Sequence, residues 1–267
     1  MKRNIQQKKI KNEPRVCKVE SCHSSKKHDL LCCQSSKRFF DALSTRVHTA
    51  AWFGIALFGI LFLLPDFFAY FLGGLLIFIL CAEWPRLFVN TYKELWWIAW
   101  WYPVVPFALL IQLSLDQVMK LPIAMLFLVV FAYDSGAYFV GSRWGKTLLF
   151  PSISPNKTGE GFLGGCISSA IAFAVIITMF FDKNVLCDFS VLQKSIFFIG
   201  IPLLISCASL LGDLFESWLK RRASLKDTGT ILPGHGGLLD RFDSILFVTI
   251  LLYFFRAKIS FLLKVVH

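Results

Sequence analysis

The residues best suited to chemistry lie in a polar segment between two long apolar runs. Residues 212–244 read GDLFESWLKRRASLKDTGTILPGHGGLLDRFDS. Four of them are spaced by three and four positions and would share one face of a helix that continues past residue 212: Asp213, Glu216, Ser217 and Lys220. Two further carboxylates, Asp240 and Asp243, stand one helical turn apart where the next apolar run begins. The segment therefore gathers carboxylates and cations at one edge of an apolar region.

The middle of this segment is built from turn-forming residues. Glycines and a proline follow Asp227 and surround a single histidine, in the order Gly229, Pro233, Gly234, His235, Gly236 and Gly237. Glycine lets a backbone approach a bound group closely. Carboxylate oxygens suit Mg²⁺, which binds through one or two carboxylates plus substrate phosphates, and Lys or Arg suit the phosphates. The residue types favour a phosphate-and-magnesium site over an ordinary basic loop between membrane spans, which is the alternative.

A second polar stretch, residues 133–165, fits the same chemistry. Asp134 stands inside an apolar run, where an ionisable side chain is costly and usually functional, although a neighbouring helix could also satisfy it. Lys157 and Thr158 follow a Ser-Pro pair in the next loop and offer a cation and a hydroxyl for a nucleotide phosphate. The spacing of a P-loop is absent.

The elements that position these residues are membrane helices. The chain of 267 residues is 56% hydrophobic with 28 Phe and a mean hydropathy of +0.62, which leaves too little polar surface for a soluble globule. The apolar runs are long and mostly free of charge, which excludes the short alternating segments of a β-barrel. The composition therefore predicts an integral membrane protein built from helices.

About seven apolar runs approach the roughly 20 residues that cross a bilayer. They are residues 49–64, 66–82, 95–115, 121–140, 162–181, 195–212 and 244–263. The predicted fold class is all-α, a polytopic transmembrane helical bundle of about seven to nine spans with cytoplasmic-facing active-site loops.

The basic residues set the expected orientation. Loops 83–94, 141–161 and 213–243 are rich in Lys and Arg, whereas the opposite loops are poor in them. Positive loops stay in the cytoplasm, so both polar stretches are expected on the cytoplasmic face of the cell inner (cytoplasmic) membrane.

The first 48 residues differ in kind from the rest. They hold 12 Lys and Arg against 4 Asp and Glu and no long apolar run. This predicts a basic, disordered cytoplasmic tail over residues 1–48, either lying against anionic lipid or serving only to set orientation, and a transmembrane catalytic domain over residues 49–267.

The stretch SWLKRRASLKDTGTILPGHGGLLDRFD (217–243) resembles the signature of the phosphatidate cytidylyltransferase family, also called CDP-diacylglycerol synthases. Every element of that signature is present over 27 residues with its spacing kept. Residues 133–165 are similar to the family's Asp-x-x-Ala-Tyr-x-x-Gly and Ser-Pro-x-Lys-Thr-x-Glu-Gly motifs. Two mild departures are Gly159, where an aromatic residue is common, and the inserted Ser142.

The resemblance implies the reaction of CTP with phosphatidate to give CDP-diacylglycerol and pyrophosphate, with Mg²⁺ as cofactor and a second cation left open. It implies catalytic roles for Asp213, Lys220, Arg221, Lys226, Asp227, His235, Asp240 and Arg241. Substrate binding falls to Asp134, Lys157, Thr158, Glu160, Ser217, Gly236 and Gly237. The implied metal carboxylates are Asp213 and Asp240, with Glu216 and Asp243 as weaker candidates.

Two other functions stay open at this stage. A membrane lipid kinase using CTP or ATP would share these residue types but transfer the γ-phosphoryl group. A cation-coupled transporter would use Asp134 and Asp213 as an intramembrane relay. The expected partners are CTP, phosphatidate and the bilayer; nucleic acid is not expected, and homo-oligomerisation is left open.

Overall fold

The computed structural model describes residues 52, 54–88, 97–98, 100–180, 190–225, 227–229 and 236–266. The predicted basic tail at residues 1–48 lies outside this part of the chain. The described residues are mostly helical, which confirms the main part of the predicted fold class. One short β-hairpin departs from an all-α fold, and it lies inside the predicted loop 141–161.

The elements follow one another along the chain with few long connections. The helical ones are Gly54–Leu63, α2 (Pro65–Phe78), the π-helical turn η1 (Ile79–Glu83), α3 (Trp84–Phe88), the π-helical turn η3 (Trp100–Val104), α4 (Val105–Ser114), the 3₁₀ turn η4 (Gln117–Met119), α5 (Lys120–Trp144), α6 (Gly159–Phe180), α8 (Val191–Ser195), the π-helical turn η5 (Ile196–Gly200), α9 (Ile201–Arg222) and α10 (Leu239–Val266). The strands are β1 (Leu148–Phe150) and β2 (Ser154–Thr158).

Four helical stretches in the described residues are long and apolar enough to cross a membrane. They are Pro65–Leu87, Gln117–Trp144, Gly159–Phe180 and Val191–Arg222. Two shorter apolar helices, Gly54–Leu63 and Trp101–Ser114, fall on predicted runs but have fewer residues than a bilayer requires. In the second of these runs, Tyr102 has an extended backbone (φ −151°, ψ 112°) that interrupts the helix beside Pro103. The count of seven to nine spans therefore stays a prediction.

The helix boundaries follow local sequence signals. Pro65 stands in the first turn of α2, where its missing N–H costs no hydrogen bond, and Pro202 does the same in α9. Ser190 begins α8 with a capping box, since its hydroxyl accepts the backbone N–H of Gln193 while the Gln193 side chain accepts the N–H of Ser190.

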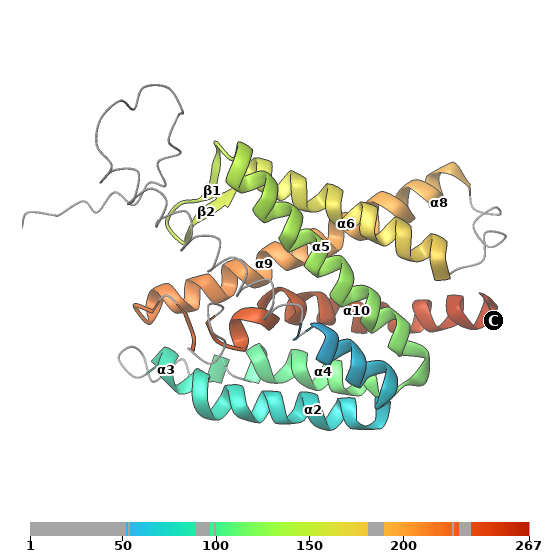
Figure 1. Cartoon of the computed structure of the whole chain (residues 1–267), viewed down its shortest axis with the longest axis horizontal. Helices are drawn as coiled ribbons and strands as arrows, with labels where there is room; N and C mark the ends of the chain where they lie inside the picture. The colour runs from blue at the N-terminus through green and yellow to red at the C-terminus, as the bar shows by residue number, and fades with distance from the viewer. Residues whose placement is uncertain are drawn as a thin grey trace, which may run out of the picture. The chain divides into compact units, whose positions relative to one another are not determined.

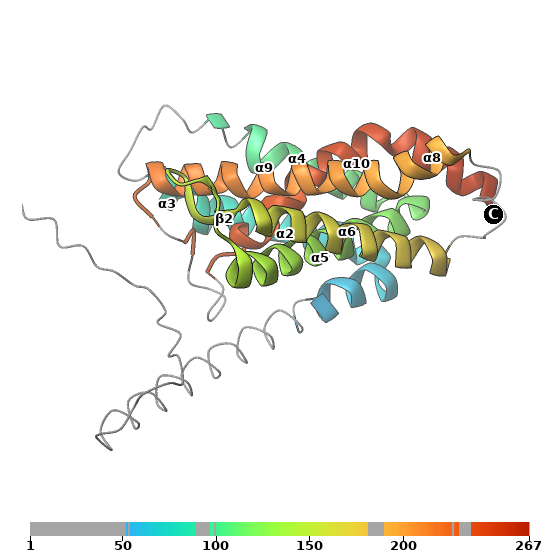
Figure 2. The ribbon, with the colours of Figure 1, turned by 90° about the horizontal axis from the view of Figure 1, so that it is seen from above.

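Helices α5 and α6 form the most extensive packing pair, and α9 lies against both α6 and α10 (Figures 1 and 2). Helix α2 packs beside α4. The largest core cluster is aromatic at its centre, where Phe107 lies 5.2 Å from Phe242 and Phe127 lies 6.3 Å from Phe242, measured between ring centroids. This core joins the first half of the chain to α10.

Two features of the fold place the polar residues. The antiparallel hairpin, with Leu148 opposite Thr158, connects the end of α5 to the start of α6. Helix α9 continues to Arg222, ten residues past the predicted end of its apolar run, which confirms that Asp213 to Lys220 share one helix. At Gly212, α9 packs directly on the backbone carbonyl of Asp243, so a side chain there would collide with α10.

Candidate active site

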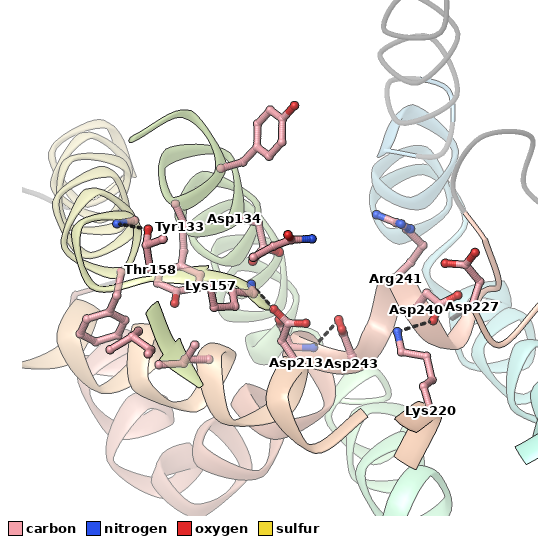
Figure 3. A pocket seen from close by; sticks show the side chains of 18 residues that line it. Tyr133, Asp134, Lys157, Thr158, Asp213, Lys220, Asp227, Asp240, Arg241 and Asp243 are labelled. Carbon is pink, nitrogen blue, oxygen red and sulfur yellow. Dashed lines mark hydrogen bonds and ion pairs between the residues drawn. The ribbon is translucent and has the colours of Figure 1, made fainter. Parts of the chain in front are cut away.

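A pocket of about 360 Å³ opens where the hairpin, α5, α9 and α10 meet (Figure 3). Its volume lies in the range of small-molecule sites. The sequence-predicted residues that line it come from both polar stretches: Asp134, Lys157, Thr158, Asp213, Lys220, Asp227, Asp240, Arg241 and Asp243. The structure therefore brings together segments that are separated by more than 50 positions in the sequence.

One group of charged residues, Asp134, Lys157 and Asp213, faces the open pocket and is called here the pocket-side cluster. Lys157 on β2 forms an ion pair with Asp213 on α9, and their side chains are 27% and 20% exposed. Burial would lower the pKa of Lys157, but the carboxylates of Asp213 and Asp134 outweigh it and raise that pKa above its usual value. Lys157 is therefore fully protonated at neutral pH and presents a fixed positive charge.

A second group, Glu216, Lys220 and Asp240, joins the last turns of α9 to the first turn of α10 and is called the α9–α10 cluster. The Lys220 ammonium donates to Asp240 Oδ1 at 2.9 Å and lies 3.6 Å from Glu216 Oε1. The side chains of Lys220 and Asp240 are only 14% and 6% exposed, and Glu216 is fully buried. This cluster is thus much drier than the pocket-side one.

Asp240 is held by the backbone as well as by Lys220. Its Oδ2 accepts the N–H groups of Gly237 at 2.8 Å and Thr228 at 3.1 Å. Burial would raise the pKa of Asp240, but Glu216, Lys220 and Gly237 lower it to about 2. Asp240 is therefore ionised and fixed in orientation at neutral pH.

Some predicted site residues do not line the pocket. Glu160 accepts the backbone N–H groups of Lys146 at 3.0 Å and Thr147 at 3.2 Å, so it holds the start of the hairpin. Arg221 donates through Nε to the carbonyl of Ile153 at 3.2 Å and ties α9 to the hairpin turn.

Four more predicted residues lie near the pocket without lining it, namely Glu216, Ser217, Gly236 and Gly237. Gly236 has a φ of +80°, a left-handed conformation that glycine adopts without strain. Lys226 and His235 lie outside the described residues.

The structure adds residues that the sequence argument did not single out. Tyr133, Tyr138, Asn156 and Phe162 line the pocket and supply its aromatic wall. Thr158, which was expected to bind phosphate, also caps α6 by accepting the N–H of Gly161 at 3.2 Å.

Glu83 is a further buried carboxylate that the sequence argument missed. An acidic residue in the apolar window around Cys81 and Trp84 was the available signal, of the same kind that drew attention to Asp134.

The pocket offers oxygen ligands of the kind that Mg²⁺ prefers. In the described part of the chain, no three His, Cys, Asp or Glu side chains are placed to hold a metal ion by themselves. Two carboxylates with substrate phosphates suffice for Mg²⁺, and Asp213, Asp240 and Asp243 all line the pocket. Both oxygens of the buried Glu216 carboxylate also lack a hydrogen-bond donor. The donor set therefore fits a magnesium ion shared with phosphate groups.

Comparison with known proteins gives one consistent result. Residues 94–258 match the model of the cytidylyltransferase family. A phosphatidate cytidylyltransferase of Bacillus subtilis (strain 168) is 46% identical over 147 residues, covering 55% of this chain and 51% of that protein. Phosphatidate cytidylyltransferases of Staphylococcus aureus (strain COL) and Staphylococcus saprophyticus are 47% and 48% identical, each covering 47% of this chain and 45% of the relative. The chain thus spans about half the length of the curated relatives it matches.

Proposed function

The chain belongs to the cytidylyltransferase family, and from this premise we propose that it transfers the cytidylyl group of CTP to phosphatidate. The products are CDP-diacylglycerol, a precursor in phospholipid biosynthesis, and pyrophosphate. The observation that carries the proposal is the pocket itself, in which Lys157, Lys220 and Arg241 alternate with carboxylates. That mixture suits two phosphate-bearing substrates and a divalent cation.

The proposed reaction needs little acid–base chemistry. An oxygen of the lipid phosphate attacks the α-phosphorus of CTP, a new P–O bond forms, and the bond from the α-phosphorus to the bridging oxygen of pyrophosphate breaks. The nucleophile is already anionic and pyrophosphate is a good leaving group. The main barrier is the repulsion between two polyanions, which fixed positive charges in a pocket partly screened from water reduce.

We assign roles by position in the pocket. Lys157 and Arg241 contact substrate phosphates, and Thr158 and Asp134 bind the substrate beside them. Lys220 faces the pocket while remaining paired to Asp240, so it supplies positive charge from a fixed point. For the predicted phosphate contacts Arg221 and Lys226, and for His235 as a positioning donor, the family resemblance is the support.

Asp213 and Asp240 would hold Mg²⁺, with Asp243 beside them and Glu216 behind. When bound there, the ion would supply positive charge that brings the phosphates together and stabilises the charge developing in transfer. The chain's own contribution is to keep these carboxylates ionised and oriented, which the contacts of Asp240 with Lys220, Gly237 and Thr228 support.

The membrane arrangement is part of the proposal. We infer a multi-pass protein of about seven to nine spans in the inner (cytoplasmic) membrane, with residues 49–267 as the catalytic domain and the basic residues 1–48 in the cytoplasm. The structure supports a common side for the active-site loops. Glu83 contacts Leu238, and Arg221 contacts Ile153, so residues of all three predicted cytoplasmic loops meet at one end of the helices.

An assay on the purified chain tests the proposal. In detergent micelles with phosphatidate, CTP and Mg²⁺, the chain should form CDP-diacylglycerol, detected by mass spectrometry, and an equal amount of pyrophosphate. Formation of CDP instead of pyrophosphate would favour the lipid kinase, and an active, metal-loaded preparation that transfers neither group would favour a transporter.

A further inference from the structure

Glu83 is a buried carboxylate that the proposed chemistry does not use. It is the last residue of η1, its exposure is 0%, and it does not line the pocket. It also precedes the residues matched by the family model. A π-helical turn reorients the residues around it and is frequent at functional sites. An ionisable group in a candidate span is tolerated when its oxygens are satisfied, so its partners show its role.

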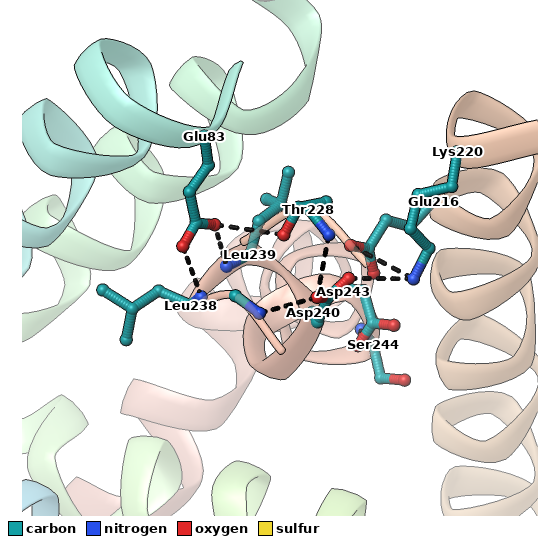
Figure 4. A network of polar contacts seen from close by, with 10 residues as sticks. Glu83, Glu216, Lys220, Thr228, Leu238, Leu239, Asp240, Asp243 and Ser244 are labelled. Atoms are coloured by element: carbon teal, nitrogen blue, oxygen red, sulfur yellow. Dashed lines mark hydrogen bonds and ion pairs between the residues drawn. The ribbon is translucent and has the colours of Figure 1, made fainter. Parts of the chain in front are cut away.

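The partners of Glu83 are the start of α10 and Thr228 (Figure 4). Its Oε1 accepts the N–H of Leu238 at 2.7 Å, and its Oε2 accepts the N–H of Leu239 at 2.8 Å. The first N–H groups of a helix have no acceptor within the helix, and a negative charge is favourable there. Glu83 therefore caps α10 from a segment that lies 155 positions earlier in the chain.

Thr228 links Glu83 to Asp240. The Thr228 hydroxyl donates to Glu83 Oε2 at 3.2 Å, while its backbone N–H donates to Asp240 Oδ2 at 3.1 Å. The same residue thus touches the buried carboxylate with its side chain and the pocket carboxylate with its backbone. A displacement of Thr228 or of the first turn of α10 would move Asp240.

The glycines of the signature leave room for this contact. A Cβ atom at Gly237 would lie 2.8 Å from Glu83 Oε2, and one at Gly229 would lie 3.0 Å from Glu83 Oε1. Both separations are shorter than ordinary contacts, so side chains at these positions would displace the carboxylate. These two glycines therefore accommodate Glu83, in addition to any close approach to a ligand.

We propose that Glu83 is a positioning residue, which fixes the N-terminus of α10 and, through Thr228, the orientation of the Asp240 carboxylate toward Lys220 and the pocket. The proposal rests on the proposed function for its effect on turnover, because the position of Asp240 matters to activity only if this pocket performs the transfer. The capping role itself is a statement about structure and is tested separately.

Four variants of the full chain in detergent test the proposal. Glu83→Gln keeps the volume but turns an NH₂ group toward backbone donors, and Thr228→Val removes only the hydroxyl link. Thr228→Ser keeps that hydroxyl. Asp66→Asn removes an exposed carboxylate from the first turn of α2, in the same candidate span, and is the matched control.

Two measurements are made on each variant. In hydrogen exchange with mass spectrometry, Glu83→Gln should speed amide exchange in peptides covering residues 236–241 by about tenfold or more, as expected for a lost buried hydrogen bond. In steady-state kinetics it should lower kcat by about tenfold or more while the KM for phosphatidate changes by less than about threefold. Thr228→Val should change both in the same direction, whereas Thr228→Ser and Asp66→Asn should stay within about twofold of wild type.

Each other outcome contradicts a defined part of the proposal. Unchanged exchange in Glu83→Gln would refute the cap, and faster exchange with wild-type kcat would refute the positioning role. Equal losses in Thr228→Ser and Thr228→Val would refute the hydroxyl link. If Glu83→Gln does not fold, Thr228→Val decides: a wild-type kcat overturns the proposal. A wild-type chain that transfers no cytidylyl group refutes the proposed function alone, because the exchange measurement still tests the cap.

Discussion

The two charged clusters use the same residue types for different purposes. In the pocket-side cluster, Lys157 pairs with Asp213 across a gap between the hairpin and α9, and both side chains keep a fifth or more of their surface exposed. In the α9–α10 cluster, Lys220 and Asp240 are nearly buried and are surrounded by further hydrogen bonds from the backbone. The first pair can exchange its partner for a substrate phosphate, while the second is fixed.

This difference separates binding from positioning. A partly hydrated ion pair costs little to open, since surface pairs contribute about 0 to 1 kcal/mol. A buried pair is costly to break, because removing one partner leaves an uncompensated charge. Charge in the pocket-side cluster is therefore expected to govern activity alone, and charge in the α9–α10 cluster to govern both activity and stability.

The largest expected effect comes from neutralising one carboxylate in each cluster. Asp213→Asn and Asp240→Asn should each lower turnover by about 100-fold or more, equivalent to about 2.7 kcal/mol of transition-state stabilisation. Asp213→Asn should purify and unfold like wild type. Asp240→Asn should also lose thermal stability, because either orientation of the amide turns an NH₂ toward Lys220 or toward the Thr228 and Gly237 N–H groups.

Turnover and thermal unfolding in detergent check this pair. A variant that keeps more than about a tenth of wild-type activity, a loss below roughly 1.4 kcal/mol, would remove that carboxylate from the proposed site. Equal stability of the two variants would contradict the separation between the clusters.

The lysines give a second, smaller test. Lys220→Met should cost about 3 to 5 kcal/mol of stability, because it leaves the buried Glu216 and Asp240 carboxylates without their cation. Lys157→Met should cost about 1 kcal/mol or less, since its pair is more exposed. Thermal unfolding followed by size-exclusion chromatography measures both, and a Lys157→Met variant as unstable as Lys220→Met would overturn the assignment.

The smallest effect is expected outside both clusters. Deleting residues 2–40 should leave turnover in detergent within a few-fold of wild type, because all pocket residues lie beyond residue 130. Binding to anionic liposomes should weaken, by roughly 1 kcal/mol for each basic residue that had been near the surface. Complete loss of activity in a correctly inserted truncation would place part of the site in the tail.

The sequence predicted best where the signal was local. The carboxylate spacing from Asp213 to Lys220 predicted a shared helix, and α9 confirms it because the apolar run continues into an amphipathic turn. The family resemblance is confirmed by the match over residues 94–258. The charged signature also predicted which residues gather at the pocket, since most of them line it.

Long-range contacts and short strands escaped the sequence argument. The loop 141–161 contains a hairpin, because Leu148–Phe150 and Ser154–Thr158 are too short to show a strand pattern. Glu83 was missed because its partners are backbone N–H groups 155 and 156 positions away, which no spacing rule connects. Whether Glu160 serves the hairpin alone or also the substrate stays a prediction.

The position of the isotope label tests the central claim most directly. The purified chain is incubated with phosphatidate, Mg²⁺ and CTP labelled at either the α- or the γ-phosphate, and the lipid is extracted and counted. Attack of the lipid phosphate on the α-phosphorus predicts α-label in the lipid, γ-label in pyrophosphate, and loss of both signals with a chelator. Appearance of γ-label in the lipid with release of CDP would contradict the account and identify a lipid kinase instead.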